Sequence, residues 1–150
     1  GFFAVELVAD VIVIAAEKIS NEEIENVRFL CCDAKYLGEL FPKDFFERIY
    51  LNFSDPWPKK GYYKRRLTYR AFLEIYKTLL ADDGVLRLKT DNVGLFDFSL
   101  EEFEAAGMQV LRMSRDLHNS PLNEGNVMTE YEKNFSEKGF NICSAEVHFN

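Results

Sequence analysis

The chain has 150 residues, of which 47% are hydrophobic and 15% aromatic. This apolar content excludes an intrinsically disordered protein, and the length suffices for one domain with a core of its own. No apolar run approaches the ~20 residues that a membrane-spanning helix needs, so we expect no membrane partner. The 25 acidic and 18 basic residues give a net charge of −7, a balance that by itself disfavours a nucleic-acid partner.

Apolar runs alternate with helical stripes along the chain. In chain order they predict a strand at residues 4–7, a helix at 9–18, a strand at 27–32, a short helix at 36–40, a strand at 48–53, a helix at 68–80, a strand at 85–89, a helix at 95–106, a strand at 109–113, a loop at 115–127, a helix at 129–138 and a strand at 143–150. Strands that alternate with helices indicate an α/β fold with a mostly parallel sheet. No linker or repeat interrupts the pattern, so we expect a single domain over residues 1–150.

Local signals predict where several of these elements end. Residues 82–84 (DDG) should close the helix before them, and Gly107 should stop the helix at 95–106. Ser99 and Glu102 have the spacing of a capping box within that helix. Apolar and polar residues alternate from 143 to 150, which predicts a half-exposed strand at an antiparallel edge of the sheet.

The three cysteines, Cys31, Cys32 and Cys143, are an odd number without metal-type spacing. They favour neither a disulfide framework nor a metal site, and we expect a reducing, cytoplasmic compartment and no bound metal.

Basic residues are concentrated in one segment, residues 59–70. This segment holds six of the 18 Lys and Arg residues, contains no acidic residue, and includes Tyr62, Tyr63 and Tyr69 among the cations. Cations beside aromatic rings can bind phosphates and stack on bases, so the segment predicts a polyanion-binding strip, although a merely solvated helix start is the alternative.

Four carboxylates follow predicted strands: Glu6, Asp33, Asp55 and Asp91. Ligands of open parallel sheets bind at the carboxyl ends of the strands, and a carboxylate there can accept from the two hydroxyls of a ribose. We therefore predict a nucleoside-bearing ligand, with Glu6 at its ribose and Asp33 at an adenine amino group. Each acid alone could instead cap the helix that follows it.

Residues 52–60 (NFSDPWPKK) form the most distinctive stretch, because two prolines fix the backbone on both sides of the single tryptophan. Together with residues 64–69 (KRRLTY), 89–92 (KTDN), 116–120 (DLHNS) and 128–132 (MTEYE), this stretch resembles the bacterial tRNA (guanine-N7-)-methyltransferase family. The resemblance implies a Rossmann-like class I S-adenosylmethionine-dependent methyltransferase fold, with a mostly parallel seven-stranded sheet, an antiparallel last strand and helices on both faces. It also implies methyl transfer from S-adenosylmethionine to N7 of the variable-loop guanine, position 46, of tRNA.

The resemblance carries roles over to individual residues. Asp55 would be the catalytic residue and, with Glu6 and Asp33, would contact the cofactor. The guanosine substrate would meet Lys59, Asp91, Thr129, Glu130, Tyr131 and Glu132. The tRNA backbone would meet Gly61, Tyr62, Tyr63, Lys64, Arg65 and Arg66. Thr129 and Glu132 also have capping-box spacing, so a structural role for them is equally open, and we expect His118 to position the loop around it.

One departure from the family concerns its glycine-containing cofactor loop and first strand, which should precede Glu6. Residues 1–3 resemble only the tail of that loop, so we expect residues to be missing before Gly1 and a skipped segment between Phe3 and Ala4. Two other functions stay open: a methyltransferase acting on an exocyclic amino group of a nucleic acid, and a non-catalytic RNA-binding subunit that keeps the fold. A monomer and a homodimer are both compatible with the sequence.

Overall fold

A computed structural model describes residues 1–149, which form two compact units, Gly1–Leu40 and a second unit that begins at Phe41. The N-terminal unit contains, in chain order, β1 (Phe2–Glu6), α1 (Ala9–Asn21), β2 (Val27–Cys31), the 3₁₀ turn η1 (Ala34–Tyr36) and the one-turn helix α2 (Leu37–Leu40). β1 and β2 are parallel neighbours joined by α1, as the alternating pattern predicted. Glu6 lies opposite Cys31, so the carboxyl ends of both strands share one edge.

The first strand begins earlier than the sequence predicted. Phe3 and Ala4 are successive residues of β1 and lie opposite Arg28 and Phe29, which are also successive. Phe2 and Phe3 are therefore strand residues rather than the tail of a loop, and the skipped segment after Phe3 stays a prediction.

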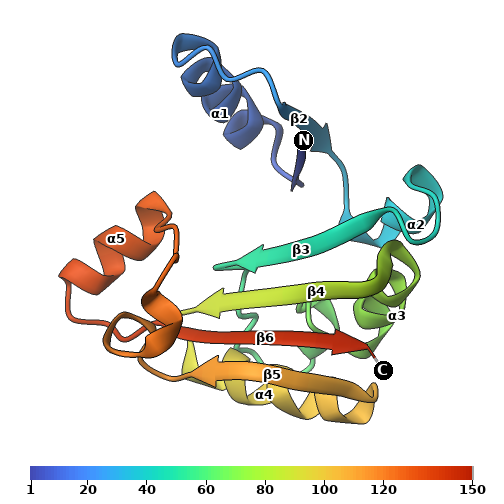
Figure 1. Ribbon diagram of the computed structural model, residues 1–150, viewed down its shortest axis with the longest axis vertical. Helices are drawn as coiled ribbons and strands as arrows, with labels where there is room; N and C mark the ends of the chain where they lie inside the picture. The colour runs from blue at the N-terminus through green and yellow to red at the C-terminus, as the bar shows by residue number, and fades with distance from the viewer. Residues whose placement is uncertain (150) are drawn as a thin grey trace. The chain divides into compact units, whose positions relative to one another are not determined.

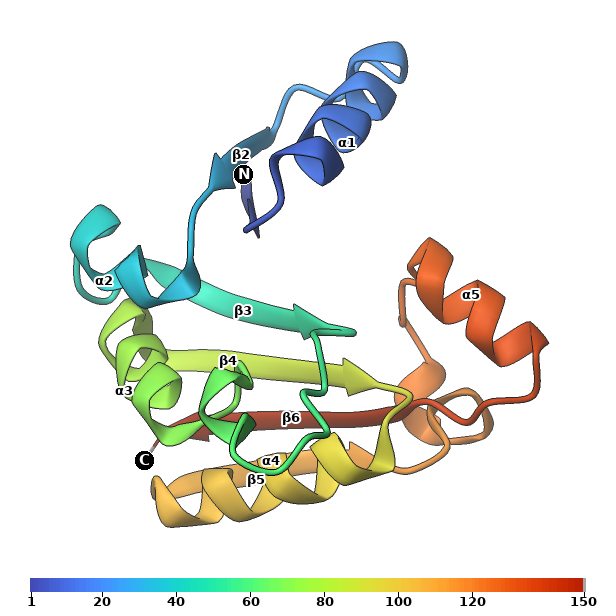
Figure 2. The same cartoon turned by 180° about the vertical axis from the view of Figure 1, so that it is seen from behind.

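The C-terminal unit contains the remaining strands and helices. In chain order they are β3 (Phe46–Asn52), η2 (Tyr63–Arg65), α3 (Arg70–Leu79), β4 (Leu80–Thr90), α4 (Val93–Ala105), β5 (Met108–Ser114), η3 (Leu117–Asn119), η4 (Pro121–Asn123), α5 (Glu130–Glu137) and β6 (Cys143–Phe149). α3 and α4 lie on the same face of the sheet, and α5 lies beyond the carboxyl ends of β3 and β4 (Figures 1 and 2). Leu73 and Tyr76 of α3, Phe96 and Phe103 of α4 and Leu88 of β4 belong to one hydrophobic core cluster.

The four strands of this unit have the order β3-β4-β6-β5. β3 and β4 are parallel, and β6 is antiparallel to both of its neighbours, which confirms the antiparallel last strand. Its predicted place at an edge is wrong, because β6 lies between β4 and β5 and its first five residues are buried. The polar residue Glu146 is satisfied there by the guanidinium groups of Arg87 and Arg112 from the two flanking strands.

Two predicted element ends are also wrong. Residues 82–84 do not end a helix but belong to β4, where the pairing jumps from Phe46↔Leu80 to Arg48↔Val85 and the extra residues form a bulge. Ser99 and Glu102 lie in the middle of α4, whose N-cap is Asn92. Glu102 Oε2 instead accepts from the backbone N–H of Arg70 at 2.7 Å and so caps the start of α3.

Over the described residues, the structure contains no helix long and apolar enough to span a bilayer.

Candidate functional site

In the N-terminal unit, the two predicted cofactor residues follow neighbouring strands at the same sheet edge. Glu6 Oε1 accepts from the backbone N–H groups of Leu7 at 3.0 Å and Val8 at 3.2 Å, which fixes the carboxylate just ahead of α1. Asp33 Oδ1 accepts from the N–H of Lys35 at 3.0 Å and caps η1. Asp33 therefore has the capping role that was the alternative reading, whereas Glu6 bonds to the two residues before α1 and does not cap that helix. Both acids are half-buried.

In the C-terminal unit, the loop after β3 has an unusual backbone. Phe53 has φ of 54° and Trp57 has φ of 42°, a left-handed region that side-chain-bearing residues rarely occupy. Asp55 lies between them and is exposed. Next to it, the Ser54 hydroxyl oxygen is buried and has no hydrogen-bond partner among the described residues. Strained backbone and an unsatisfied hydroxyl beside an exposed acid are features that cluster at functional sites.

Asp91 follows the neighbouring strand β4 and approaches α5. The Tyr131 hydroxyl donates to Asp91 Oδ1 at 3.2 Å. Burial and the nearby Asp91 charge both raise the pKa of Tyr131, so its hydroxyl stays protonated and can donate. The Tyr131 ring lies 4.7 Å from the Phe53 ring and is stacked at 4.1 Å on Phe135. Two of the predicted substrate residues, Asp91 and Tyr131, are thus brought together beside the loop that carries Asp55.

A buried ionic cluster supports the start of α5. Glu132 is fully buried, and its carboxylate lies 2.7 Å from Lys89 Nζ, 2.7 Å from His118 Nε2 and 2.9 Å from Asn126 Nδ2. Lys89 Nζ also donates to Asn126 Oδ1 and to the carbonyl of Val127. Burial opposes ionisation of Glu132, but the hydrogen bonds from its three partners outweigh it and lower the pKa of this carboxyl. The Glu132 carboxylate is therefore ionised near neutral pH, and both of its oxygens accept hydrogen bonds.

This cluster changes what the sequence predicted for the segment. Thr129 Oγ1 accepts from the N–H of Glu132 at 3.1 Å, which confirms the capping interaction at the start of α5. Both carboxylate oxygens of Glu132 are occupied from within the protein. The sequence alone did not indicate the roles of Lys89 and Asn126, although a lysine in a buried strand is a signal that an acid should be near.

The basic segment contains cations in four kinds of surroundings. Arg70 is paired with Glu102 on α4, and Arg66 is half-buried against the loop of residues 53–58. Arg65 lies over the rings of Trp57 and Tyr62, at 5.0 and 4.6 Å from their centroids. The remaining three are exposed: Lys59, Lys60 and Lys64. An exposed cationic and aromatic surface thus adjoins the Asp55 loop, which agrees with a polyanion-binding strip.

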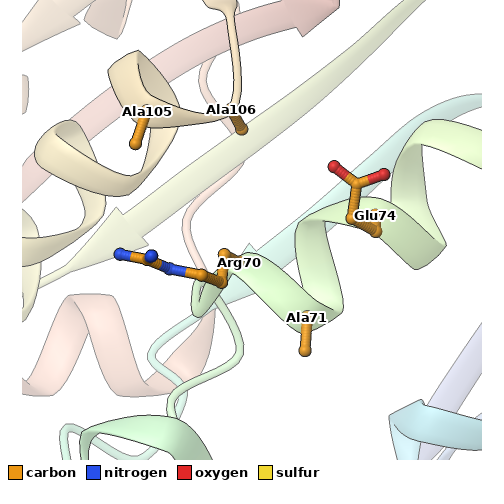
Figure 3. Close-up of a pocket in the computed structure, with 5 residues that line it drawn as sticks. All are labelled: Arg70, Ala71, Glu74, Ala105 and Ala106. Carbon is orange, nitrogen blue, oxygen red and sulfur yellow. The ribbon is translucent and has the colours of Figure 1, made fainter.

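Two hollows elsewhere on the C-terminal unit are lined by none of the predicted catalytic, cofactor-binding or substrate-binding residues. One of about 270 Å³ lies between α3 and the end of α4 and is lined by Arg70, Ala71, Glu74, Ala105 and Ala106 (Figure 3). Another of about 590 Å³ includes Lys43, Lys77 and Phe149 among its lining residues. Within the described part of the chain, no group of His, Cys, Asp or Glu side chains is arranged to hold a metal ion.

Solved structures with the same fold define the class of protein. An rRNA methylase from Streptococcus thermophilus superposes with a TM-score of 0.63 at 12% identity, covering 98% of this chain and 72% of that one. A methyltransferase homologue from Pyrococcus horikoshii gives 0.68 at 17% identity, covering 99% of this chain and 53% of that one. The fold is that of the Rossmann-like methyltransferases.

Sequence comparison identifies the family within that class. The family model described as "Putative methyltransferase" matches residues 1–145. The chain is 50% identical over 149 residues to a tRNA (guanine-N7-)-methyltransferase of Geobacillus and 47% identical to that of Bacillus subtilis, covering 99% of this chain in both cases. It covers 67% and 70% of those two relatives. The chain belongs to the tRNA (guanine-N7-)-methyltransferase family.

Proposed function

We propose that this protein transfers a methyl group from S-adenosylmethionine to N7 of a guanine in tRNA, at variable-loop position 46. The observation that carries the proposal is the Asp55 loop: an exposed carboxylate on strained backbone, with a cationic and aromatic surface beside it. The near 50% identity to named tRNA (guanine-N7-)-methyltransferases supports the same reaction.

Asp55 is the proposed catalytic residue. Guanine N7 carries an in-plane lone pair and no proton near neutral pH, so the reaction requires no base to remove one. The task of the protein is to hold N7 in line with the methyl group and to stabilise the positive charge that develops on the purine. A carboxylate held on a rigid loop suits the second task, because it does not have to reorient during transfer.

Asp91 is the proposed guanine-reading residue. Its carboxylate can accept from N1–H and the N2 amino group of guanine, which adenine does not present in the same way. Tyr131 donates to Oδ1, so it orients the carboxylate while Oδ2 can accept from the base. Lys59, Thr129 and Glu130 complete the proposed surroundings of the substrate. Glu132 is proposed to contribute by holding α5 in place, since its oxygens are bonded within the protein.

Glu6 and Asp33 are the proposed cofactor residues of the N-terminal unit. S-adenosylmethionine supplies a methyl group activated by a sulfonium when it is bound. The two acids fit this ligand chemically, because carboxylates pair with the ribose hydroxyls and the adenine amino group. Glu6 Oε1 and Asp33 Oδ1 accept from backbone N–H groups, which fixes each carboxylate at the sheet edge and leaves its second oxygen to meet a ligand.

For the tRNA backbone we propose contacts from Gly61, Tyr62, Tyr63, Lys64 and Arg65. These residues are all exposed. Their cations would act mainly on phosphates and their rings would stack on bases, which fixes the position of the tRNA without reading its sequence.

A transfer assay on the full-length protein tests this function. The protein is incubated with methyl-labelled S-adenosylmethionine and either tRNA with guanine at position 46 or the same tRNA with adenine there. Incorporation into the first tRNA alone is the expected result. Binding of both ligands without incorporation would support the non-catalytic RNA-binding alternative and overturn the proposal.

A further inference from the structure

The loop of residues 53–58 has little backbone hydrogen bonding with which to hold its own shape. Pro56 and Pro58 lack a backbone N–H, so neither can donate. Phe53 and Trp57 have positive φ values of 54° and 42°, an arrangement that persists only when surrounding groups impose it. Phe53 N–H is anchored on the carbonyl of Lys89 at 2.9 Å, which fixes the start of the loop but not its far side.

On the far side of the loop, one side chain, Arg66, donates hydrogen bonds to two backbone carbonyls. Arg66 Nε donates to the carbonyl of Pro56 at 2.8 Å, and its Nη2 donates to the carbonyl of Trp57 at 3.3 Å. The guanidinium carbon lies 4.5 Å from the ring centroid of Phe98 on α4. The Arg66 guanidinium is thus held by two hydrogen bonds in its plane and by an aromatic ring on its face.

We propose that Arg66 is a positioning residue for methyl transfer, which clips the loop after β3 to α4 and thereby fixes Asp55. Pro56 is bonded directly to Asp55, and the hydrogen bond to the Pro56 carbonyl constrains the Pro56–Trp57 peptide, one residue beyond the catalytic carboxylate. This proposal rests on the proposed function, since it assigns Arg66 to the orientation of Asp55 rather than to the tRNA backbone.

The neighbouring Arg65 makes contacts of a different kind. Arg65 is exposed and lies over Trp57 and Tyr62, and among the described residues its side chain donates to no carbonyl. Its donors can therefore meet phosphate oxygens, whereas two of the Arg66 donors are already used on Pro56 and Trp57. Two adjacent arginines of equal charge thus provide a matched pair for experiment.

The first test separates transfer from binding. Arg66→Met in the full-length protein should lower kcat for methyl transfer about tenfold to a hundredfold, the scale expected when a catalytic group is displaced, with a small change in KM for tRNA. Arg66→Lys should lose most of the same rate, because an ammonium group keeps the charge but cannot reproduce the planar fork. Arg65→Met should mainly raise KM for tRNA.

Salt dependence distinguishes the two arginines independently of rate. For Arg65→Met, the slope of log tRNA affinity against log salt should become shallower by roughly 0.7–0.9, the change for one lost phosphate contact. For Arg66→Met the slope should stay that of the unmodified protein. A shallower slope together with an unchanged kcat for Arg66→Met would make Arg66 a phosphate contact and overturn the proposal.

Trp57 offers a readout that needs no enzymatic activity, because it is the single tryptophan of the chain. In Arg66→Lys and Arg66→Met, acrylamide should quench the Trp57 fluorescence more strongly, because the ring becomes more accessible. The far-UV circular dichroism spectrum should stay unchanged. If the unmodified protein did not transfer a methyl group to tRNA, the proposed function would fail. The quenching measurement would still test whether Arg66 holds the loop against α4. Unchanged quenching in both Arg66 variants would overturn the clip itself, whatever the activity.

Discussion

Asp55 and Asp91 follow adjacent parallel strands of one sheet, yet the protein holds them in different ways. Asp55 is exposed on a strained loop that is fastened through backbone carbonyls by Arg66. Asp91 is half-buried and is oriented by the Tyr131 side chain. The next residue of α5 after Tyr131 is Glu132, which is bonded to Lys89 and His118 in the buried ionic cluster. An acid that follows a strand can therefore be held in place in two ways. Asp55 is held by the geometry of its loop, and Asp91 by a tyrosine on the helix that the buried ionic cluster supports.

Among the predicted variants, the one that removes Glu132 should have the largest effect on the buried cluster next to Tyr131. Glu132→Ala leaves Lys89, which is only 4% exposed, as a buried charge without its carboxylate. Loss of one partner of a buried pair should lower the free energy of unfolding by about 3–5 kcal/mol. Denaturant titration measures this, and Glu137→Ala on the exposed side of α5 is the control, with an expected change within about 0.5 kcal/mol.

The same cluster has a predictable pH dependence. The pKa of Glu132 in the folded protein is below its ordinary value of 4.5, so the carboxylate stabilises the fold above that pH. This stabilisation is lost as pH falls from about 4.5 through the lower folded pKa. The difference in unfolding free energy between the unmodified protein and Glu132→Gln should therefore shrink in that window. A difference that stays constant from neutral pH to below the window would contradict an ionised Glu132.

The proposed catalytic role of Asp55 is tested by removing its charge without disturbing the fold. Asp55→Ala should lower kcat/KM for methyl transfer by about a hundredfold to a thousandfold, the loss seen when one group that stabilises developing charge is removed. Since Asp55 is exposed, the melting temperature should stay close to that of the unmodified protein. Asp55→Asn keeps the shape and is expected to lose a similar rate. Near-normal turnover in both variants would remove Asp55 from the mechanism.

The cationic surface beside Asp55 should have a smaller, salt-dependent effect. Lys64→Ala combined with Arg65→Ala should weaken tRNA binding about tenfold at moderate salt and flatten its salt dependence, while S-adenosylmethionine binding is unchanged. Lys43→Ala combined with Lys77→Ala removes the same charge around the separate 590 Å³ hollow and should leave both properties nearly unaltered. Equal losses in the two double variants would mean that net charge alone matters, without a docking surface.

The smallest expected effect is at Tyr131. Tyr131→Phe keeps the ring contacts with Phe53 and Phe135 but removes the hydrogen bond to Asp91. Loss of one hydrogen bond of ordinary strength, about 1 kcal/mol, should lower kcat/KM roughly fivefold and reduce discrimination against adenine at the target position. Steady-state kinetics on the two tRNAs measures both quantities. A Tyr131→Phe protein with unaltered discrimination would leave Asp91 oriented by other groups.

Local patterns predicted most of the fold correctly. β2, β3, α4 and α5 lie within a few residues of their predicted positions, because apolar periodicity and caps such as Thr129 are local signals. The central place of β6 could not be predicted this way, since its polar residue Glu146 resembles a solvent-facing one until Arg87 and Arg112 are brought beside it. The bulge in β4 likewise depends on pairing with β3.

The candidate site was predictable to a similar extent. Asp55 and Asp91 were found because an acid after a parallel strand is a positional signal, and their roles stay predictions. The contacts that hold them, Arg66 on the Pro56 carbonyl and Lys89 on Glu132, join segments 10 and 43 residues apart. Spacing alone does not indicate such pairs, so only the three-dimensional arrangement separated Arg66 from Arg65.

Mass spectrometry of tRNA nucleosides tests the central claim most directly. The full-length protein is incubated with unmodified tRNA and S-adenosylmethionine carrying a labelled methyl group, and the digested nucleosides are compared with standards. We predict label in 7-methylguanosine and its loss when Asp55 is replaced by alanine. Label in a guanosine or adenosine methylated on an exocyclic amino group, or no labelled nucleoside at all, would contradict the account.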